Sequence, residues 1–368
     1  MSGIFSQKFG AASFLKFFDK DRSVLGIDIG TSSLKIVQAR KESERAVLET
    51  YGELSTSAYG NKEMGRASLL VDEKVSEMIA DLKKEAGATA TRGVVSIPLR
   101  YSFITVIEMP ELSDKELADA IPYEARRYIP IALSDVLLDW WRIPLGENEN
   151  EEKKATISIL LVAVQREVVE KYRHILENAK IEQAGFEVEV FSAARLTGPR
   201  LHQAHLFIDI GALSTKISIA ESGIIRAVHH VDRASQQLSL ALSQSLGVDF
   251  NRAEQMKKEL GVIQRPEAAG IRHTIAPLLN SIFDEADRLR VNYRRKSGMT
   301  VDKVFLLGGG SLMPGILDYA IEKLGIEVIL SNPFNQFEYP IFLQTKLKDI
   351  APVFTTAANL TLRALQEA

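Results

Sequence analysis

Short apolar runs and alternating apolar positions dominate the start of the chain, and this is the pattern of β-strands. Residues 24–40 hold two such runs around a Gly-Thr-Ser turn, so we expect a β-hairpin, and residues 47–54 supply a third strand. Residues 69–85 repeat their apolar positions at helical spacing, and residues 93–98 read as a buried strand. The chain therefore opens with a mixed α/β unit.

Residues 99–186 carry a second alternation of strands and helices, which predicts a compact insertion of the order β-α-β-β-α. Ser113 stands before acidic residues and is a suitable start for the first helix of the insertion, and Pro130 is expected to end that segment. Residues 146–155 form a charged loop that must lie in solvent. Gly185 is expected to stop the last helix.

The second half of the chain opens by nearly repeating the first hairpin. Residues 25–37 read LGIDIGTSSLKIV and residues 206–218 read LFIDIGALSTKIS, and eight of the thirteen aligned positions are identical. Helical patterns follow, and residues 306–316, LLGGGSLMPGI, predict a strand, a glycine turn and a helix that begins near Met313 or Pro314. The duplication predicts two similar lobes that face each other across a cleft.

The amino-acid composition excludes several kinds of site and partner. The chain has 368 residues, 46% hydrophobic and 25% charged, and a net charge of -3, which gives no electrostatic reason to expect a nucleic-acid partner. The absence of cysteine excludes disulfides, thiolate zinc sites and cysteine nucleophiles, and the six histidines have no metal-ligand spacing. No run of residues is long and apolar enough to predict a membrane span.

The N-terminal segment, residues 1–23, is amphipathic. On a helical wheel Ala11, Phe14, Leu15 and Phe18 share one face. Two interpretations stay open: a helix that docks on its own domain or a mobile tail, and a short anchor on a membrane surface or a partner protein.

Each hairpin turn carries the pattern Asp-Ile-Gly-x-x-Ser, which suits a phosphate. Glycine lets the backbone approach an anion closely, and the amide groups of the turn can cradle its oxygens. An aspartate so near an anion makes sense if it orders the water shell of Mg²⁺, so we expect Asp28 and Asp209 to hold Mg²⁺ largely through water. Lys35 and Lys216 either add charge there or point into solvent. The candidate phosphate-binding residues are Asp28, Gly30, Thr31, Ser32, Ser33 and Lys35 in the first turn, and Asp209, Gly211, Ala212, Ser214 and Thr215 in the second.

Three consecutive glycines, Gly308, Gly309 and Gly310, followed by Ser311, form the third element of the pattern. A backbone without side chains offers a flat shelf for a purine, although a glycine run also fits a close crossing of helix and strand. The order of two phosphate turns followed by a glycine shelf resembles the actin-like ATPase superfamily. Residues 120–141, AIPYEARRYIPIALSDVLLDWW, resemble the insertion of its FtsA/PilM branch, and of PilM in particular.

This resemblance implies an α/β fold of the actin-like (ribonuclease-H-like) kind, with two lobes, an FtsA/PilM-type inserted subdomain, and bound ATP with Mg²⁺. It also implies that Glu254 and Lys257 contact the adenosine together with residues 308–311, although an exposed amphipathic helix fits that segment equally well. The implied units are an N-terminal segment (1–23), a first lobe (24–98), the insertion (99–186), a crossover (187–200), a second lobe (201–335) and a C-terminal return to the first lobe (336–368).

The resemblance implies a cytoplasmic component of the type IV pilus machine, or of a related secretion machine. Such a protein lies peripherally at the inner face of the plasma membrane, grips the N-terminal peptide of a single-span PilN-like protein, meets other pilus components and forms a homo-oligomer or ring. The candidate peptide groove holds an arginine pair beside apolar and aromatic side chains, although plain packing explains each of them equally well. These residues are Tyr123, Arg126, Arg127, Tyr128, Ile129 and Pro130.

Two departures from the superfamily pattern bear on activity. Where relatives often carry an aspartate before the crossover, the chain offers Glu187 or Glu189, and Leu213 stands where a polar residue is expected. No residue is a convincing base for orienting an attacking water. We therefore expect an ATP-responsive scaffold with at most weak ATPase activity. The alternatives are a filament-forming ATPase of the FtsA or MreB type and a small-molecule kinase.

Overall fold

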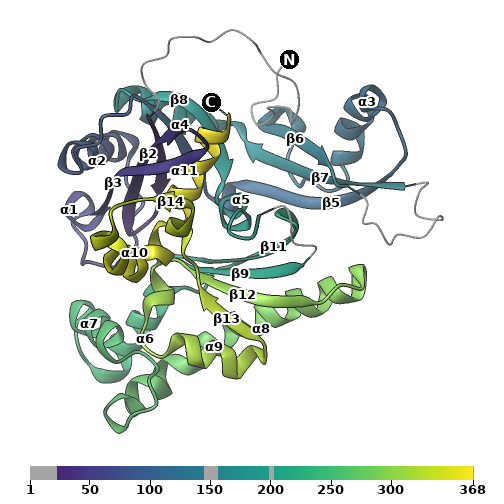
Figure 1. Cartoon of the computed structure of the whole chain (residues 1–368). Coiled ribbons are helices and arrows are strands. Elements are labelled where there is room, and N and C mark those ends of the chain that lie inside the picture. The colour runs from purple at the N-terminus through teal and green to yellow at the C-terminus, as the bar shows by residue number, and fades with distance from the viewer. Residues whose placement is uncertain (1–22, 145–155, 199–202, 368) are drawn as a thin grey trace.

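The computed structural model describes residues 23–144, 156–198 and 203–367 (Figure 1). The amphipathic N-terminal segment up to residue 22 and the charged loop of residues 146–155 lie outside the described residues, so their predicted roles stay predictions.

A six-stranded sheet forms the centre of the first lobe, and the predicted hairpin lies in its middle. The first two strands pair antiparallel, with Asp28 opposite Lys35 in the register; β4 then pairs parallel with β1, and β8 pairs parallel with β4. In spatial order the strands are β14 (Phe337–Glu338), β3 (Arg45–Ser55), β2 (Ser33–Glu42), β1 (Ser23–Ile29), β4 (Arg92–Ile97) and β8 (Glu182–Val188).

Helices cover both faces of this sheet. The amphipathic helices α2 (Asp72–Glu85) and α4 (Arg166–Asn178) pack on each other, while α11 (Thr355–Glu367) packs on β1, β2 and β4. Gly26 allows α11 to approach closely, because a Cβ at this position would lie 2.0 Å from the carbonyl oxygen of Ala357. The short helices α1 (Ser57–Gly60) and α10 (Gln344–Ile350) complete the lobe.

The insertion is a three-stranded antiparallel sheet with one helix and a small apolar core of its own. The predicted start at Ser113 is confirmed, because its hydroxyl and the Glu116 carboxylate form a capping box. Its elements are β5 (Ser102–Pro110), α3 (Asp114–Ala125), β6 (Val136–Arg142) and β7 (Thr156–Gln165).

The prediction for the end of the last helix was wrong. Gly185 does not stop a helix: α4 already ends at Asn178, and Gly185 pairs with Val94 inside strand β8 of the first sheet. Pairing with a distant strand outweighs the local preference of glycine for a helix end. The fifth element expected of the insertion, helix α4, packs on α2 of the first lobe instead.

The second lobe repeats the strand order of the first. Its hairpin of β9 and β10 has one antiparallel strand on one side and two parallel strands on the other, in the order β11 (Ile224–Val231), β10 (Thr215–Glu221), β9 (Ala204–Ile210), β12 (Val301–Leu307) and β13 (Glu327–Leu330). The sequence repeat thus marks a duplicated topology. Its helices are α6 (Ser235–Leu246), α7 (Phe250–Leu260), α8 (Ala269–Ser297) and α9 (Ile316–Leu324).

Helix α5 (Glu189–Ala194) follows β8 and lies between the two sheets (Figure 1). It contacts β8 and α11 of the first lobe and β10 and β11 of the second. Val190, Ala193 and Ala194 of this helix share one apolar cluster with Phe207 and Leu307 of the second sheet. The lobes therefore meet through a packed core beneath the cleft.

Candidate functional site

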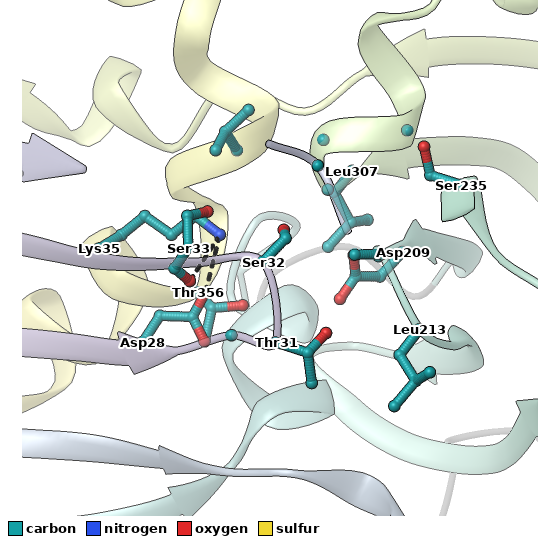
Figure 2. A pocket seen from close by; sticks show the side chains of 18 of the residues that line it. Asp28, Thr31, Ser32, Ser33, Lys35, Asp209, Leu213, Ser235, Leu307 and Thr356 are labelled. Atoms are coloured by element: carbon teal, nitrogen blue, oxygen red, sulfur yellow. Dashed lines mark hydrogen bonds and ion pairs between the residues drawn. The ribbon is translucent and has the colours of Figure 1, made fainter. Parts of the chain in front are cut away.

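The two repeated turns line one cavity of about 590 Å³ between the lobes. In Figure 2, Asp28, Ser32 and Lys35 lie on one side and Asp209 and Leu213 on the other. The predicted convergence of the turns is therefore present in the structure. Sequence-predicted residues that line the cavity are Asp28, Gly30, Thr31, Ser32, Ser33, Lys35, Asp209, Gly211, Ala212, Ser214, Glu254, Lys257, Gly308, Gly309 and Gly310.

Thr215 and Ser311 were also proposed as site residues, but they do not line this cavity. Both are buried, and each hydroxyl donates to a backbone carbonyl: Thr215 to Arg233 at 2.6 Å and Ser311 to Gly308 at 2.7 Å. Thr215 alternates inward at the start of β10, as the two-residue period of a strand requires. These two hydroxyls stabilise the backbone of the turns outside the cavity lining.

The carbonyl groups of both turns are held by neighbouring backbone. Ser68 N–H donates to Thr31 O at 2.7 Å, and Thr56 N–H donates to Ser32 O at 3.0 Å. In the second turn, Gly211 O and Ala212 O accept from the first residues of α6, each at 3.0 Å. A trans peptide points its N–H opposite to its C=O, so the N–H groups that follow these carbonyls point away from the neighbouring backbone. Two sets of amide donors can therefore face an anion from opposite lobes.

Glycine is required at both turns because the chain folds back closely on itself. A Cβ on Gly30 would lie 2.7 Å from Ser33 O, and a Cβ on Gly211 would lie 2.9 Å from Ser214 O.

The lysines of the two hairpins have different partners. Lys35 Nζ lies 3.9 Å from an Asp28 oxygen, and the other Asp28 oxygen accepts from the Ser96 hydroxyl at 3.0 Å. Lys216 Nζ lies 2.8 Å from Asp209 and 3.1 Å from Glu189, so it joins two carboxylates. Both lysines lie in the cavity wall, and the prediction that they might point into solvent is wrong.

Burial and mutual attraction shift the pKa values of this second cluster. Burial raises the pKa of Glu189, the nearby Lys216 lowers it, and the neighbouring carboxylates of Asp209 and Asp28 bring it to a net rise. Burial alone would lower the pKa of Lys216, but Asp209 and Glu189 raise it well above its ordinary value. The ammonium group therefore keeps its charge in the cleft.

The sequence offered either Glu187 or Glu189 in place of the aspartate before the crossover, and the structure distinguishes the two. Glu189 lines the cavity, whereas Glu187 is 4% exposed and accepts from Ser192, Arg195 and Arg363. Burial raises the pKa of a carboxyl, but the two arginines outweigh this effect and hold the pKa of Glu187 below its ordinary value. Glu187 therefore ties α5 to α11, and only Glu189 faces the cleft.

The glycine shelf closes one side of the cavity. Gly308 adopts φ 80° and ψ 167°, a backbone region that is essentially restricted to glycine, and its N–H donates to Pro352 O at 2.9 Å. A Cβ on Gly308 would lie 2.2 Å from Asp209 Oδ1, so the shelf and the second turn are in direct contact. The following helix begins at Ile316, not at Met313 or Pro314, because a 3-10 turn over Gly309–Leu312 precedes it.

Glu254 and Lys257 also line the cavity, as a nearly buried pair on α7. Lys257 Nζ lies 2.6 Å from Glu254 and donates to the Ser235 and Ser239 hydroxyls. Burial would raise the pKa of Glu254, but Lys257 holds it below its ordinary value. The alternative interpretation, an exposed amphipathic helix with its charges outward, therefore does not hold for these two side chains.

Sequence reasoning missed a connection that crosses the cleft. Residues 61–71 of the first lobe reach the second: Ala67 N–H donates to the Gln236 side chain, and the Arg66 guanidinium lies 5.5 Å from the Phe250 ring centroid. Gly65 approaches Glu254 so closely that a Cβ would lie 2.9 Å from its carboxyl carbon. A short loop without a repeated pattern carries no local signal for such contacts.

Comparison with known proteins identifies the family. The family model described as type IV pilus assembly protein PilM matches residues 26–365, nearly the whole chain. The chain belongs to the PilM family. It is also 25% identical to the chain of a solved PilM-PilN type IV pilus biogenesis complex, with a TM-score of 0.77 over 93% of this chain and 98% of that chain.

More distant relatives share the fold. The MreB5 protein of Spiroplasma citri, solved bound to ADP, is 13% identical with a TM-score of 0.55, over 94% of this chain and 96% of that chain. The cell division protein FtsA of Bacillus subtilis is 21% identical over 271 residues, which cover 66% of this chain and 60% of FtsA. The actin-like fold predicted from the sequence is confirmed. None of the helices in the described part of the chain combines the length and apolar character that a membrane crossing requires.

The candidate groove residues of this PilM family member surround the C-terminal end of α3. Tyr123 is 70% exposed, and Arg126 stacks over its ring with the guanidinium carbon 5.5 Å from the centroid. Arg127 and Tyr128 both contact Glu124, at 2.8 and 3.4 Å. Ile129 is 6% exposed and belongs to the apolar core of the insertion, so it cannot be a contact residue on the surface. Tyr123, Arg126, Arg127, Tyr128 and Pro130 are the members of the set that stay exposed.

Proposed function

We propose that this PilM family member is an ATP-binding scaffold of a type IV pilus or related secretion machine, and that it grips the N-terminal peptide of a PilN-like inner-membrane protein. The membership of the family and the likeness to a chain from a PilM-PilN complex support the partner. The observation that carries the nucleotide part is the pair of matching turns around one cavity.

In this proposal the turn amides, Lys35 and Lys216 hold the phosphates, while Gly308 to Gly310 and the Glu254–Lys257 pair receive the adenosine. The described residues include no group of three His, Asp or Glu side chains that could hold a metal ion directly. The carboxylates of Asp28 and Asp209 nevertheless offer oxygen ligands at the cavity wall, and oxygen is the ligand type that Mg²⁺ takes. These two residues would hold the ion through its water shell, and the ion would neutralise phosphate charge.

The same contacts support weak hydrolysis at most. A base that orients an attacking water needs a free acceptor, and Glu189 is the acidic residue of the crossover that faces the cavity. In this structure Oε1 accepts from Leu99 N–H and Oε2 pairs with Lys216, so Glu189 could orient a water only after Lys216 has turned to the phosphate. The protein therefore acts as a nucleotide-responsive adaptor, held at the cytoplasmic face of the membrane by its partner.

The peptide is expected to contact the exposed ring of Tyr123 and the guanidinium groups beside it, since aromatic and arginine side chains dominate binding energy at interfaces. The occupant would be an amphiphilic segment with apolar and acidic residues.

Calorimetric titration of the full chain with ATP and Mg²⁺ tests the nucleotide site. Gly211→Ala should weaken ATP binding at least about tenfold, because its Cβ would collide with Ser214 O inside the turn. Gly270→Ala is the matched control, since nothing lies within 4 Å of the Cβ it would add. A flat titration of the unaltered protein would reject the nucleotide-binding role.

Capture on an immobilised N-terminal peptide of a PilN-like protein tests the partner. Tyr123→Ala combined with Arg126→Ala should abolish capture, whereas Phe342→Ala, which removes an aromatic ring that is 79% exposed near α10, should not. Equal capture by both variants would contradict the proposed groove.

The likeness of the fold to MreB5 and FtsA keeps a second candidate, a filament-forming ATPase. Sedimentation of the pure protein with ATP distinguishes the two. Large ATP-dependent polymers that form without the peptide would favour the filament.

A further inference from the structure

One carboxylate of the cleft has two different partners, and they belong to different parts of the molecule. Glu189 Oε2 lies 3.1 Å from Lys216 Nζ on β10 of the second lobe. Glu189 Oε1 accepts from the backbone N–H of Leu99 at 2.9 Å. Leu99 begins the short turn Leu99–Tyr101, which leads directly into β5, the first strand of the insertion.

The entrance to the insertion is itself part of the cavity wall. Pro98 and Arg100, on either side of Leu99, both line the cavity. Strand β5 then runs beside β11 of the second lobe. A change at the phosphate turns can thus reach the base of the insertion through a single side chain.

The lysines of the two hairpins differ in the carboxylates that they contact. The first lysine, Lys35, lies 3.9 Å from Asp28, its nearest carboxylate partner. Lys216 pairs with two carboxylates, and the second of them is anchored to Leu99. An arriving phosphate is a strong competitor for an ammonium group, because charge-assisted hydrogen bonds to anions are among the strongest in proteins.

We propose that Glu189 is a positioning residue that couples the nucleotide site to the insertion, and hence to the partner peptide. This inference rests on the proposed function. In the structure, Lys216 draws Glu189 toward the second lobe, and Glu189 holds the backbone N–H of Leu99. A bound phosphate draws Lys216 to itself, Glu189 loses that partner, and the base of the insertion moves with Leu99.

The burial of the cluster makes the coupling effective. The side chains of Lys216 and Glu189 are 12% and 13% exposed, so water screens their attraction little. A stronger anion that arrives there competes with both carboxylates for the ammonium group of Lys216. Linkage also requires the reverse effect: the peptide must change the affinity for ATP by the same factor.

Glu189→Gln separates the two contacts. The amide oxygen still accepts from Leu99 N–H, while the ionic attraction to Lys216 is lost. Peptide affinity would be measured by calorimetry with and without saturating ATP for the full chain, for Glu189→Gln, and for Glu327→Gln, which alters an exposed ion pair with Lys303 on β13. The unaltered chain and the control should show a ratio of at least about fivefold between the two conditions, a modest allosteric coupling. The ratio for Glu189→Gln should fall to within about twofold of one, because its affinity without ATP should already match the value that the unaltered chain reaches with ATP.

A second readout needs no peptide. Addition of ATP should change backbone hydrogen exchange in β5 and α3 of the unaltered chain but not of Glu189→Gln. An unaltered ratio in Glu189→Gln that still binds ATP overturns the inference, and so does a ratio of one in the unaltered chain that binds both ligands. Absence of ATP binding by the unaltered chain overturns the proposed function instead.

Discussion

Gly308 is the residue at which the fold and the candidate site depend on the same atoms. We predict that Gly308→Ala destabilises the protein and damages the site, whereas Gly309→Ala, one residue further, does not destabilise it. The new Cβ at 308 would meet Asp209 Oδ1 at 2.2 Å and Ile210 O at 2.7 Å, while nothing lies within 4 Å of a Cβ at 309.

Two costs combine at position 308. A side chain in this backbone region costs about 1–3 kcal/mol of strain, and forcing an extra carbon into a packed contact costs about 1–3 kcal/mol more. We therefore expect Gly308→Ala to lower the free energy of unfolding by about 2–6 kcal/mol. Because Asp209 must also move, ATP affinity should fall at least about tenfold, or about 1.4 kcal/mol.

Urea denaturation followed by circular dichroism measures the first quantity and calorimetric titration with ATP the second. The Gly309→Ala protein serves as the control for stability, and Gly270→Ala as the control for ATP binding. Free energies of unfolding for the two variants within about 1 kcal/mol of each other would refute the reasoning, because strain and collision at 308 would then be relieved at almost no cost.

Three further outcomes are expected. Glu187→Gln should lower the free energy of unfolding by about 3–5 kcal/mol at neutral pH, since it leaves the Arg195 and Arg363 charges without their buried carboxylate. The folded pKa of Glu187 lies below the ordinary 4.5, so this contribution is complete above pH 4.5 and is lost as the pH falls further. Urea denaturation at decreasing pH should therefore show a shrinking difference from the unaltered protein, and a constant difference would contradict the prediction. Arg66→Ala should cost about 0.5–1 kcal/mol in the same assay by removing the contact with Phe250, and Arg66→Lys should cost less, so the opposite order would contradict a cation–π contact. Ile129→Ala should cost about 2–5 kcal/mol, while Tyr123→Ala stays within about 0.5 kcal/mol and weakens only peptide binding; equal thermal stability of the two variants would place Ile129 outside the core.

Local patterns predicted the parts of the fold that depend on neighbours in the sequence. The hairpins were predictable because alternation and the tight turn lie within one short stretch, and the Ser113 cap because its partner Glu116 is three residues away. Gly185 was assigned to a helix end because its real partner, Val94, lies in a strand far back in the chain.

In the candidate site, too, local patterns were predictable and contacts between distant segments were not. The duplicated Asp-Ile-Gly pattern was enough to predict that both turns line one cavity. The sequence could not decide between Glu187 and Glu189, because the arginines that bury the first and the lysine that holds the second come from other elements. The Arg66–Phe250 contact had no signal at all, since it joins an irregular loop to a helix of the other lobe.

The duplicated strand order has a consequence for any elongated ligand in the cleft. Two matching halves present nearly the same groups from each side, so they can grip a chain of phosphates but cannot distinguish its head from its tail. Only features without a counterpart can fix the direction in which the ligand lies. Glu189 beside Lys216 and the Glu254–Lys257 pair are two such features, so they would decide the polarity of a bound molecule.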